Sequence, residues 1–463
     1  MPSRRYRALA LAMAVLAIAS CFLLPLLAAR VVRGAMERSG AMDRAAYASG
    51  TSPWSWRFRD ANDLVAGKVF GDAAIKSGEQ GLIVAPTRSG RGELGFPLTR
   101  QADLSRLNLL RLDASAPAGQ FSIVVRPTLS APLVRADLTG LAAPIHLDQL
   151  TWRDATGATV AAPGRAAMLR LAFMLPTDAT LVLRGASLAR AGGPLPETGT
   201  PIPTGLTAEG LLHWRDQQRA IDPLTTFGSM PPPSPGPNWL RLTPVAVYFV
   251  LLIANSIRTR RQRTTSRLDD LVHAALAAAG PLWLIVGLGL APRPDASAVA
   301  MFAGGVAYAA YLTWIRAVPR WHWKGNWRMA GWPLLAIPVA LGVAAVAGHA
   351  PAWPPLGRAL LYIGWAFFQQ WLMLAVVAGL LARALPRPAA VLLTALAFAL
   401  LHTPNGLLMQ LCFVAELGWA WWYLHHRSLL PVAVAHAAAA VIMQACMAGG
   451  VLRSLEVSAR FLS

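Results

Sequence analysis

Apolar residues follow two different patterns along this chain, and the change of pattern divides it into regions. From about residue 239 onward, long apolar runs alternate with short polar or basic loops, and one further apolar run covers residues 8–29. A run of about 20 apolar residues is long enough to cross a bilayer as a helix. We therefore predict about nine transmembrane helices, the run at 8–29 and spans near residues 240–256, 271–291, 298–315, 330–348, 359–382, 389–402, 406–424 and 429–450.

Residues 30–190 show short apolar runs between Gly, Pro and Asp, and several of these runs alternate apolar with polar positions. This pattern is typical of an antiparallel β-sandwich or jelly roll. The sequence thus predicts a membrane anchor at 1–29, an inserted β-sandwich domain at 30–190, and a Pro/Gly-rich linker with one short amphipathic helix at 191–238. Four transmembrane helices follow at 239–348 and four more at 349–463.

Composition supports a membrane protein. The chain is 55% hydrophobic and 14% charged, whereas soluble domains carry about 25% charged residues. The net charge of +20 comes from 42 Lys and Arg, three of which are Lys, against 22 Asp and Glu. Much of this charge lies in every second loop between the predicted spans, within residues 258–267, 316–328 and 383–387. Cytoplasmic loops of membrane proteins carry such charge, so the partner of these arginines is the lipid bilayer and not nucleic acid.

The same charge pattern predicts the orientation of the chain. It places the basic loops and the N-terminus in the cytoplasm and residues 30–238 outside it, as in a multi-pass protein of a bacterial inner membrane. The three cysteines all lie inside apolar segments, which excludes a disulfide framework and a cysteine-based zinc cluster.

Polar side chains inside the last four spans are the candidates for chemistry, because polar groups are costly in a membrane. They are Gln369, Gln370, His402, Glu416, His436 and Gln444. Peptide hydrolysis needs a base that takes a proton from water and donors that hold the oxyanion. Two imidazoles and a carboxylate are also a donor set that zinc can use. The sequence requires no cofactor, and zinc at His402 and His436 stays an alternative.

The order and spacing of these residues resemble a known family. Residues 398–402 read Phe-x-x-x-His, Thr-Pro-Asn-Gly follows, and His436 comes after Ser-Leu-Leu-Pro. Over about residues 355–450 the chain resembles the CAAX-processing and bacteriocin-processing (CPBP, or Abi) intramembrane proteases. This resemblance implies an endopeptidase that cleaves a membrane-anchored peptide or protein. It implies catalytic roles for His402 and His436, with Phe398 and Asn405 supporting the substrate or the oxyanion.

The chain also departs from the pattern of that family. Gln369 and Gln370 stand where the resemblance places a pair of glutamates, Leu374 stands at an arginine position, and Ala440 closes the last motif in place of Asn or His. A glutamine amide cannot take up a proton near neutral pH, and the first of those glutamates is the proposed base of the family. Glu416, the only acidic residue in the last four spans, could take the place of this base, and Gln444 could supply the missing side-chain amide.

Three functions remain open from the sequence. The first is a CPBP-type endopeptidase with an altered catalytic set. The second is an inactive relative that binds a substrate or assists assembly. The third is an envelope transport or polysaccharide-export component. The glutamine pair could instead join helices by hydrogen bonds, and Trp419, Trp421, Trp422 and Tyr423 are typical of an interfacial aromatic belt.

Overall fold

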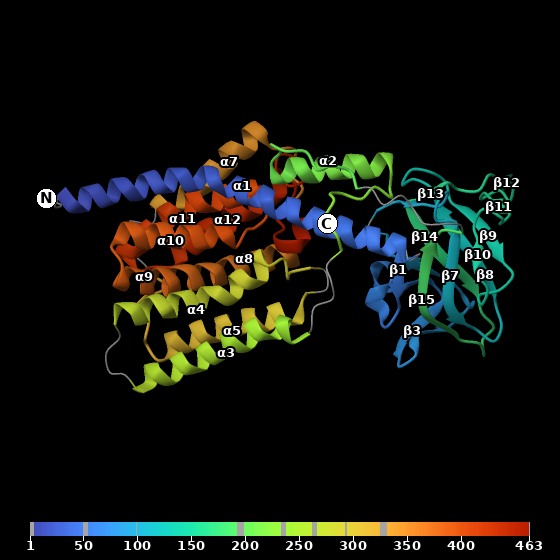
Figure 1. Cartoon of the computed structure of the whole chain (residues 1–463), viewed down its shortest axis with the longest axis horizontal. Coiled ribbons are helices and arrows are strands. Elements are labelled where there is room, and N and C mark those ends of the chain that lie inside the picture. The colour runs from blue at the N-terminus through green and yellow to red at the C-terminus, as the bar shows by residue number, and fades with distance from the viewer. Residues whose placement is uncertain are drawn as a thin grey trace. The chain divides into compact units, whose positions relative to one another are not determined.

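The structure is a computed structural model that describes residues 4–49, 54–98, 100–191, 199–232, 238–261, 266–291, 294–324 and 331–462. The chain divides into two compact units. The helical unit consists of Met1–Arg33, Thr204–Leu212 and Pro235–Ser463, and the β unit consists of Gly34–Pro203 and His213–Ser234 (Figure 1).

Two antiparallel sheets form most of the β unit. The first sheet has the strand order β10-β7-β15-β4-β3, with β1 also paired to β15, and the second has the order β12-β11-β9-β8-β14-β5-β2. The predicted β-rich region is confirmed. Its strands are β1 Ser55–Arg57, β2 Val69–Gly71, β3 Ala73–Gly78, β4 Gly81–Pro86, β5 Arg91–Phe96, β6 Ala102–Asp103, β7 Leu109–Ser115, β8 Gln120–Arg126, β9 Val134–Leu138, β10 Ile145–His146, β11 Trp152–Arg153, β12 Thr159–Val160, β13 Arg165–Ala166, β14 Met168–Met174 and β15 Leu181–Ala189, with β6 and β13 forming a separate pair.

The core of the β unit lies between its two sheets. Leu169 and Leu171 of β14 are fully buried, whereas Arg170 between them is only half-buried, as expected for a strand with one face on a core. Leu82 of the first sheet and Ile123 of the second belong to the same hydrophobic cluster. Alternation of apolar residues along the strands therefore produces one shared core.

The N-terminal helix α1, Arg4–Ala48, is longer than the predicted anchor, which ends at residue 29. Its second half is less apolar, but Met36, Ala41 and Tyr47 are buried. Arg44 donates hydrogen bonds to the carbonyl oxygens of Phe227 and Met230 at 3.2 and 2.7 Å. Contacts with residues far away in the sequence thus hold residues 30–48 in a helix that the local apolar pattern did not predict.

The helical unit consists almost entirely of helices (Figure 1). Six helices in the described part of the chain are long and apolar enough to cross a membrane, and three further apolar helices, at Gly331–Ala347, Arg387–Leu400 and Leu430–Cys446, are shorter. Each of these nine overlaps one of the predicted spans, while the number that crosses a membrane stays a prediction. The helices are α2 Ala208–Ile221, α3 Asn238–Arg261, α4 Arg267–Val286, α5 Ala296–Trp314, α6 Gly331–Leu334, α7 Ala336–Ala347, α8 Leu356–Gln370, the π-helix η4 Trp371–Ala378, α9 Gly379–Ala384, α10 Arg387–Leu400, α11 Gly406–His426, α12 Leu430–Cys446 and the 3-10 helix η5 Ser458–Leu462.

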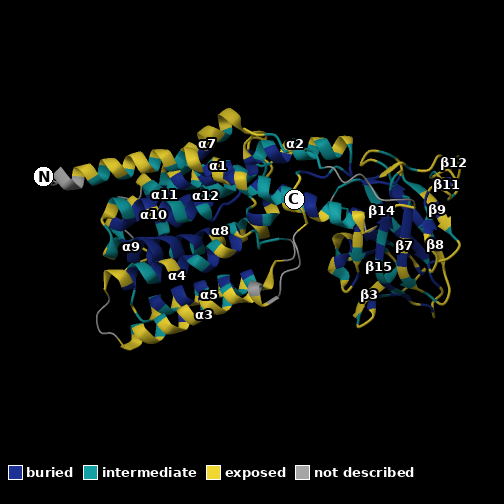
Figure 2. Ribbon diagram, in the orientation of Figure 1, coloured by how far each residue is buried: buried dark blue, intermediate teal, exposed yellow. Residues whose placement is uncertain are grey.

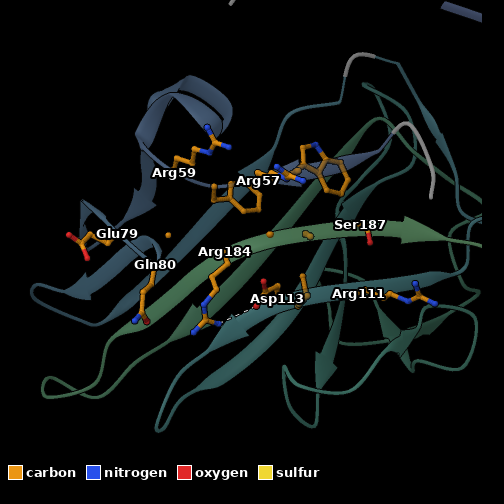
Figure 3. A pocket seen from close by; sticks show the side chains of 14 residues that line it. Arg57, Arg59, Glu79, Gln80, Arg111, Asp113, Arg184 and Ser187 are labelled. Carbon is orange, nitrogen blue, oxygen red and sulfur yellow. Dashed lines mark hydrogen bonds and ion pairs between the residues drawn. The ribbon is translucent and has the colours of Figure 1, made fainter. Parts of the chain in front are cut away.

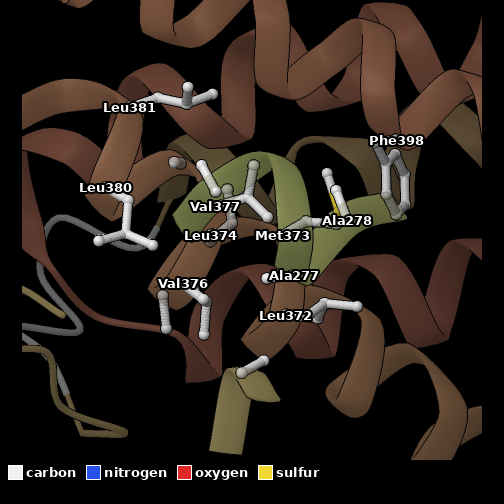
Figure 4. Packing of buried hydrophobic residues seen from close by; sticks show 14 of the residues in the cluster. Ala277, Ala278, Leu372, Met373, Leu374, Val376, Val377, Leu380, Leu381 and Phe398 are labelled. Carbon is white, nitrogen blue, oxygen red and sulfur yellow. The ribbon is translucent and has the colours of Figure 1, made fainter. Parts of the chain in front are cut away.

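The centre of the helical unit is the segment η4 with the start of α9. Every residue from 372 to 381 is buried (Figure 2), and η4 contacts α4, α5, α10 and α11. Figure 4 shows Leu374 and its neighbours packed among apolar side chains, with Ala277 of α4 and Phe398 of α10 close by. A helix that is apolar on all sides is stable when it is surrounded by other helices. The Leu374 side chain, at the expected arginine position, belongs to this core.

Candidate active site

The polar cluster begins where α8 changes into the π-helix η4. Gln370 is the last residue of α8, and Trp371–Ala378 continue the same helix with π geometry. Short π segments are frequent at functional sites, because they change which side chains face a neighbouring helix. Gln370 is fully buried at this junction.

The Gln370 side chain joins three helices. Its Nε2 donates a hydrogen bond to Glu416 Oε2 of α11 at 3.3 Å and lies 3.3 Å from His436 Nδ1 of α12. A carboxamide nitrogen carries two hydrogens, so one NH2 group can serve the carboxylate and the imidazole together. The structure thus brings together three of the residues that the sequence predicts for the site.

Two oxygens of this cluster are buried acceptors without a hydrogen-bond partner among the described residues. They are Gln370 Oε1 and Glu416 Oε1. Buried polar atoms are nearly always paired in folded proteins, so an unpaired one calls for an explanation. An acceptor pair of this kind is suited to bind an O–H or N–H donor such as water or a substrate amide.

The hydrogen bonds assign different tautomers to the two histidines. His402 Nδ1 lies 2.8 Å from the carbonyl oxygen of Phe398, and because a carbonyl only accepts, this nitrogen carries the hydrogen and Nε2 keeps a free lone pair. His436 Nδ1 faces the donating amide of Gln370, so it accepts and Nε2 carries the hydrogen. One imidazole can therefore act as a base and the other as a hydrogen-bond donor.

Aromatic rings hold the imidazoles in place. The Phe398 ring lies edge-on to both, with centroids 4.9 Å from His402 and 5.4 Å from His436. Trp419 packs against His436 at 5.6 Å, and its indole N–H donates to the carbonyl oxygen of Pro333 at 3.3 Å. Trp419, Trp422 and Tyr423 are buried and Trp421 is exposed, so three of the four residues predicted for an aromatic belt face the interior of the protein. The missed signal was the spacing, since Trp419 lies three residues after Glu416 and shares its helix face.

The turn after His402 is fixed by the C-terminal residues. Asn405 caps α11 by accepting from the Leu408 N–H at 3.2 Å, and its Nδ2 donates to the carbonyl oxygens of Ser454 and Glu456 at 2.7 and 3.5 Å. The Ser458 N–H donates to the Thr403 carbonyl oxygen. Sequence reasoning did not predict this role of residues 454–458, because no motif marks it.

Two predicted site residues lie apart from the hydrogen-bonded cluster. Gln369 is buried, but its side chain makes no hydrogen bond to a described residue. Gln444 accepts a hydrogen bond from Tyr362 at 3.4 Å, two helical turns from His436. Ala440, at the expected Asn or His position, adds no polar atom to α12.

The described side chains do not fit a zinc centre well. No group of three His, Cys, Asp or Glu residues in the described part of the chain could hold a metal ion. His436 Nδ1 and Glu416 Oε2 are both occupied by the Gln370 amide.

The cluster is enclosed. Gln370 and Glu416 are 0% exposed, and His402 and His436 are 7% and 8% exposed. Charged and polar interactions are stronger in such a site than in water. A peptide can reach it only if the surrounding helices move.

Comparison with known proteins finds one family. Residues 247–442, from α3 to α12, match the family model described as type II CAAX prenyl endopeptidase Rce1-like. No curated protein and no solved structure matches the chain. The matched segment contains every residue of the cluster around Gln370.

Proposed function

Because residues 247–442 place this chain in the CPBP family of intramembrane proteases, we propose that it is an intramembrane endopeptidase with an altered catalytic set. The single observation that carries the proposal is the Gln370 amide between Glu416 and His436, with His402 held beside them by Phe398. This arrangement supports hydrolysis because it combines an acid, a base and hydrogen-bond donors in one enclosed place.

In the proposed reaction Glu416 acts as the base. Its free Oε1 accepts a proton from a water molecule, and the water oxygen adds to the carbonyl carbon of the scissile peptide. The Nε2 hydrogen of His436 stabilises the oxyanion. The proton then passes to the leaving nitrogen, the C–N bond breaks, and a carboxylic acid and an amine result. Gln370 orients Glu416 and His436, and His402 Nε2 holds the attacking water.

The substrate we propose is a membrane-associated peptide or protein, as the family implies. We also propose that the chain lies in a bacterial inner membrane with the β unit outside the cytoplasm. The basic residues in the loops at 258–267, 316–328 and 383–387 support this orientation. We further interpret the two sheets and their shared core as a β-sandwich.

A proteolysis assay tests the proposal. The full chain in proteoliposomes is incubated with membrane-anchored peptides, and fragments are detected by mass spectrometry. Cleavage should fall at least about 100-fold on His436→Ala and on Glu416→Gln, as expected for loss of a donor or base. His425→Ala is the matched control, because His425 is exposed on the same helix as Glu416 and contacts Trp421. Equal activity of all variants would contradict the proposal.

A second candidate function is an inactive relative that binds a substrate or partner. The enclosed cluster, in which an amide stands at the position of the expected acid, favours it. In that case the wild type cleaves nothing, and the double change Gln369→Glu/Gln370→Glu creates activity. Cleavage by the wild type that depends on His402 and His436 would instead exclude this function.

A further inference from the structure

The β unit carries a pocket on the outer face of its first sheet. Its volume is about 510 Å³, which is within the usual range for sites that bind small molecules. Strands β1, β7 and β15 and the β3–β4 turn supply the lining, and Figure 3 shows the charged side chains around it. These are Arg57, Arg59, Glu79, Arg111, Asp113 and Arg184.

Strand register explains why the face is hollow at this point. Arg57 of β1 and Asp113 of β7 lie on either side of Gly185 of β15, directly opposite it in the two ladders. Arg57 and Asp113 are exposed, whereas Ala186 and Leu112, the next pair along β15 and β7, are buried. Residues opposite each other in a ladder point to the same face. The missing side chain at Gly185 therefore leaves a depression between a cation and an anion.

A bulge adds a further arginine to this depression. The β15–β7 register shifts between Leu183 and Gly185, so Arg184 is the extra residue, and bulges commonly redirect a side chain. Arg184 reaches across to Asp113, with Nη1 3.1 Å from Oδ1 (Figure 3). Asp113 is thereby neutralised.

The remaining charges of the pocket are mostly positive. Arg57, Arg59 and Arg111 are exposed, and their guanidinium groups have no hydrogen bond or ion pair with a described residue. Glu79 is the one unpaired carboxylate among the described residues of the lining. Guanidinium groups match carboxylates and phosphates with paired N–H donors. The pocket is therefore equipped for a ligand with negative charge.

We propose that this pocket of the β unit binds a small ligand that carries two or more oxyanion groups, either carboxylates or phosphates. The ligand would contact Arg57 of β1, which is opposite Gly185, and Arg111 of β7, which is opposite Ser187. This site is separate from the cluster around Gln370 and does not depend on proteolytic activity.

Calorimetric titration of the full chain in detergent micelles tests this site. The probes are pyrophosphate and citrate, which present phosphate and carboxylate groups, with sucrose as a neutral control. At least one anion should bind, and added NaCl should weaken its binding because exposed charges are screened. Binding of pyrophosphate alone identifies a phosphate site, and binding of citrate alone identifies a carboxylate site.

The variant Arg57→Ala/Arg111→Ala should weaken binding by about tenfold or more, because each lost arginine removes charge-assisted hydrogen bonds. Arg88→Ala is the matched control, since Arg88 is an exposed arginine of the same unit outside the pocket. Thermal unfolding checks that the variants stay folded. The proposal is overturned if neither anion binds, or if Arg88→Ala weakens binding as much as the double change does.

Discussion

Replacing Gln370 by leucine measures how much one buried amide contributes to the stability of the helical unit. Gln370 is 0% exposed, and leucine is close to it in size, so cavity formation adds little. The change removes the donor to Glu416 Oε2 and to His436 Nδ1. Each buried acceptor left without a partner costs about 1–3 kcal/mol. The change leaves two such acceptors and removes one, the unpaired Gln370 Oε1, so we expect a net loss of about 1–3 kcal/mol.

A double-mutant cycle separates this effect from packing. In Gln370→Leu/Glu416→Leu one of the two acceptors is removed together with its donor. Replacing both partners of a buried hydrogen bond by apolar groups is nearly neutral, in contrast to removing one. The double variant should therefore be destabilised less than the sum of the two single variants, by about 0.5–3 kcal/mol.

Unfolding of the purified chain in mixed micelles, titrated with a denaturing detergent and followed by tryptophan fluorescence, gives these free energies. Gln444→Leu is the matched control, because Gln444 is an amide of α12 with one long hydrogen bond to Tyr362, and it should cost less than about 1 kcal/mol. The reasoning is refuted if Gln370→Leu is no more costly than this control, or if the cycle is additive.

Two further predictions concern packing and pH. Gly280→Ala should destabilise the helical unit by about 1–3 kcal/mol, because the added Cβ would clash with the carbonyl oxygen of Met301 in α5. Gly364→Ala, whose Cβ would meet nothing within 4 Å, should be neutral or stabilising by up to about 1 kcal/mol. Equal effects of the two changes in unfolding titrations would contradict this. Burial of Asp103 opposes ionisation, but hydrogen bonds from Ser105 and Arg106 outweigh it and lower the pKa of the carboxyl group. Its ionised form therefore stabilises the β unit above the unfolded pKa of about 4, and this contribution is lost as pH falls through the folded value. Thermal unfolding between about pH 3 and pH 6 should show the loss in the wild type and not in Asp103→Asn.

The sequence predicted most helices, and a β-rich region without its individual strands, because these signals are local. Runs of apolar residues mark the helices of the helical unit, and alternation marks strands such as β8 and β14. The second half of α1 was missed since its stability depends on distant partners, among them the hydrogen bonds from Arg44 to the carbonyl oxygens of Phe227 and Met230. The pocket beside Gly185 was missed for a similar reason: it arises from register across three strands.

For the site, sequence reasoning found the polar residues but not their division of labour. It treated Gln369 and Gln370 alike, although neighbouring residues on a helix point about 100° apart. Only Gln370 contacts Glu416 and His436. The tautomers of the histidines also depend on which partner each Nδ1 meets, and that follows from helix packing.

The glutamine at position 370 and the acid at position 416 are chemically linked. A carboxylate at 370 would lie beside Glu416 in a buried place, and two like charges at such a distance cannot both stay ionised. An amide there instead donates to the carboxylate and to His436 together. In the proposed mechanism the acid of the site is therefore Glu416 of α11, and position 370 of α8 carries the amide. On this view Gln370→Glu in the wild-type background should impair the cluster. The variant Gln370→Glu/Glu416→Gln exchanges the two groups, so the amide at 416 can donate to the carboxylate at 370, and His436 can donate to that carboxylate once its hydrogen lies on Nδ1. This variant should therefore be more stable than Gln370→Glu alone. Unfolding titrations of the two variants decide the matter, and equal stability of the single and the exchanged variant would show that the two positions are independent.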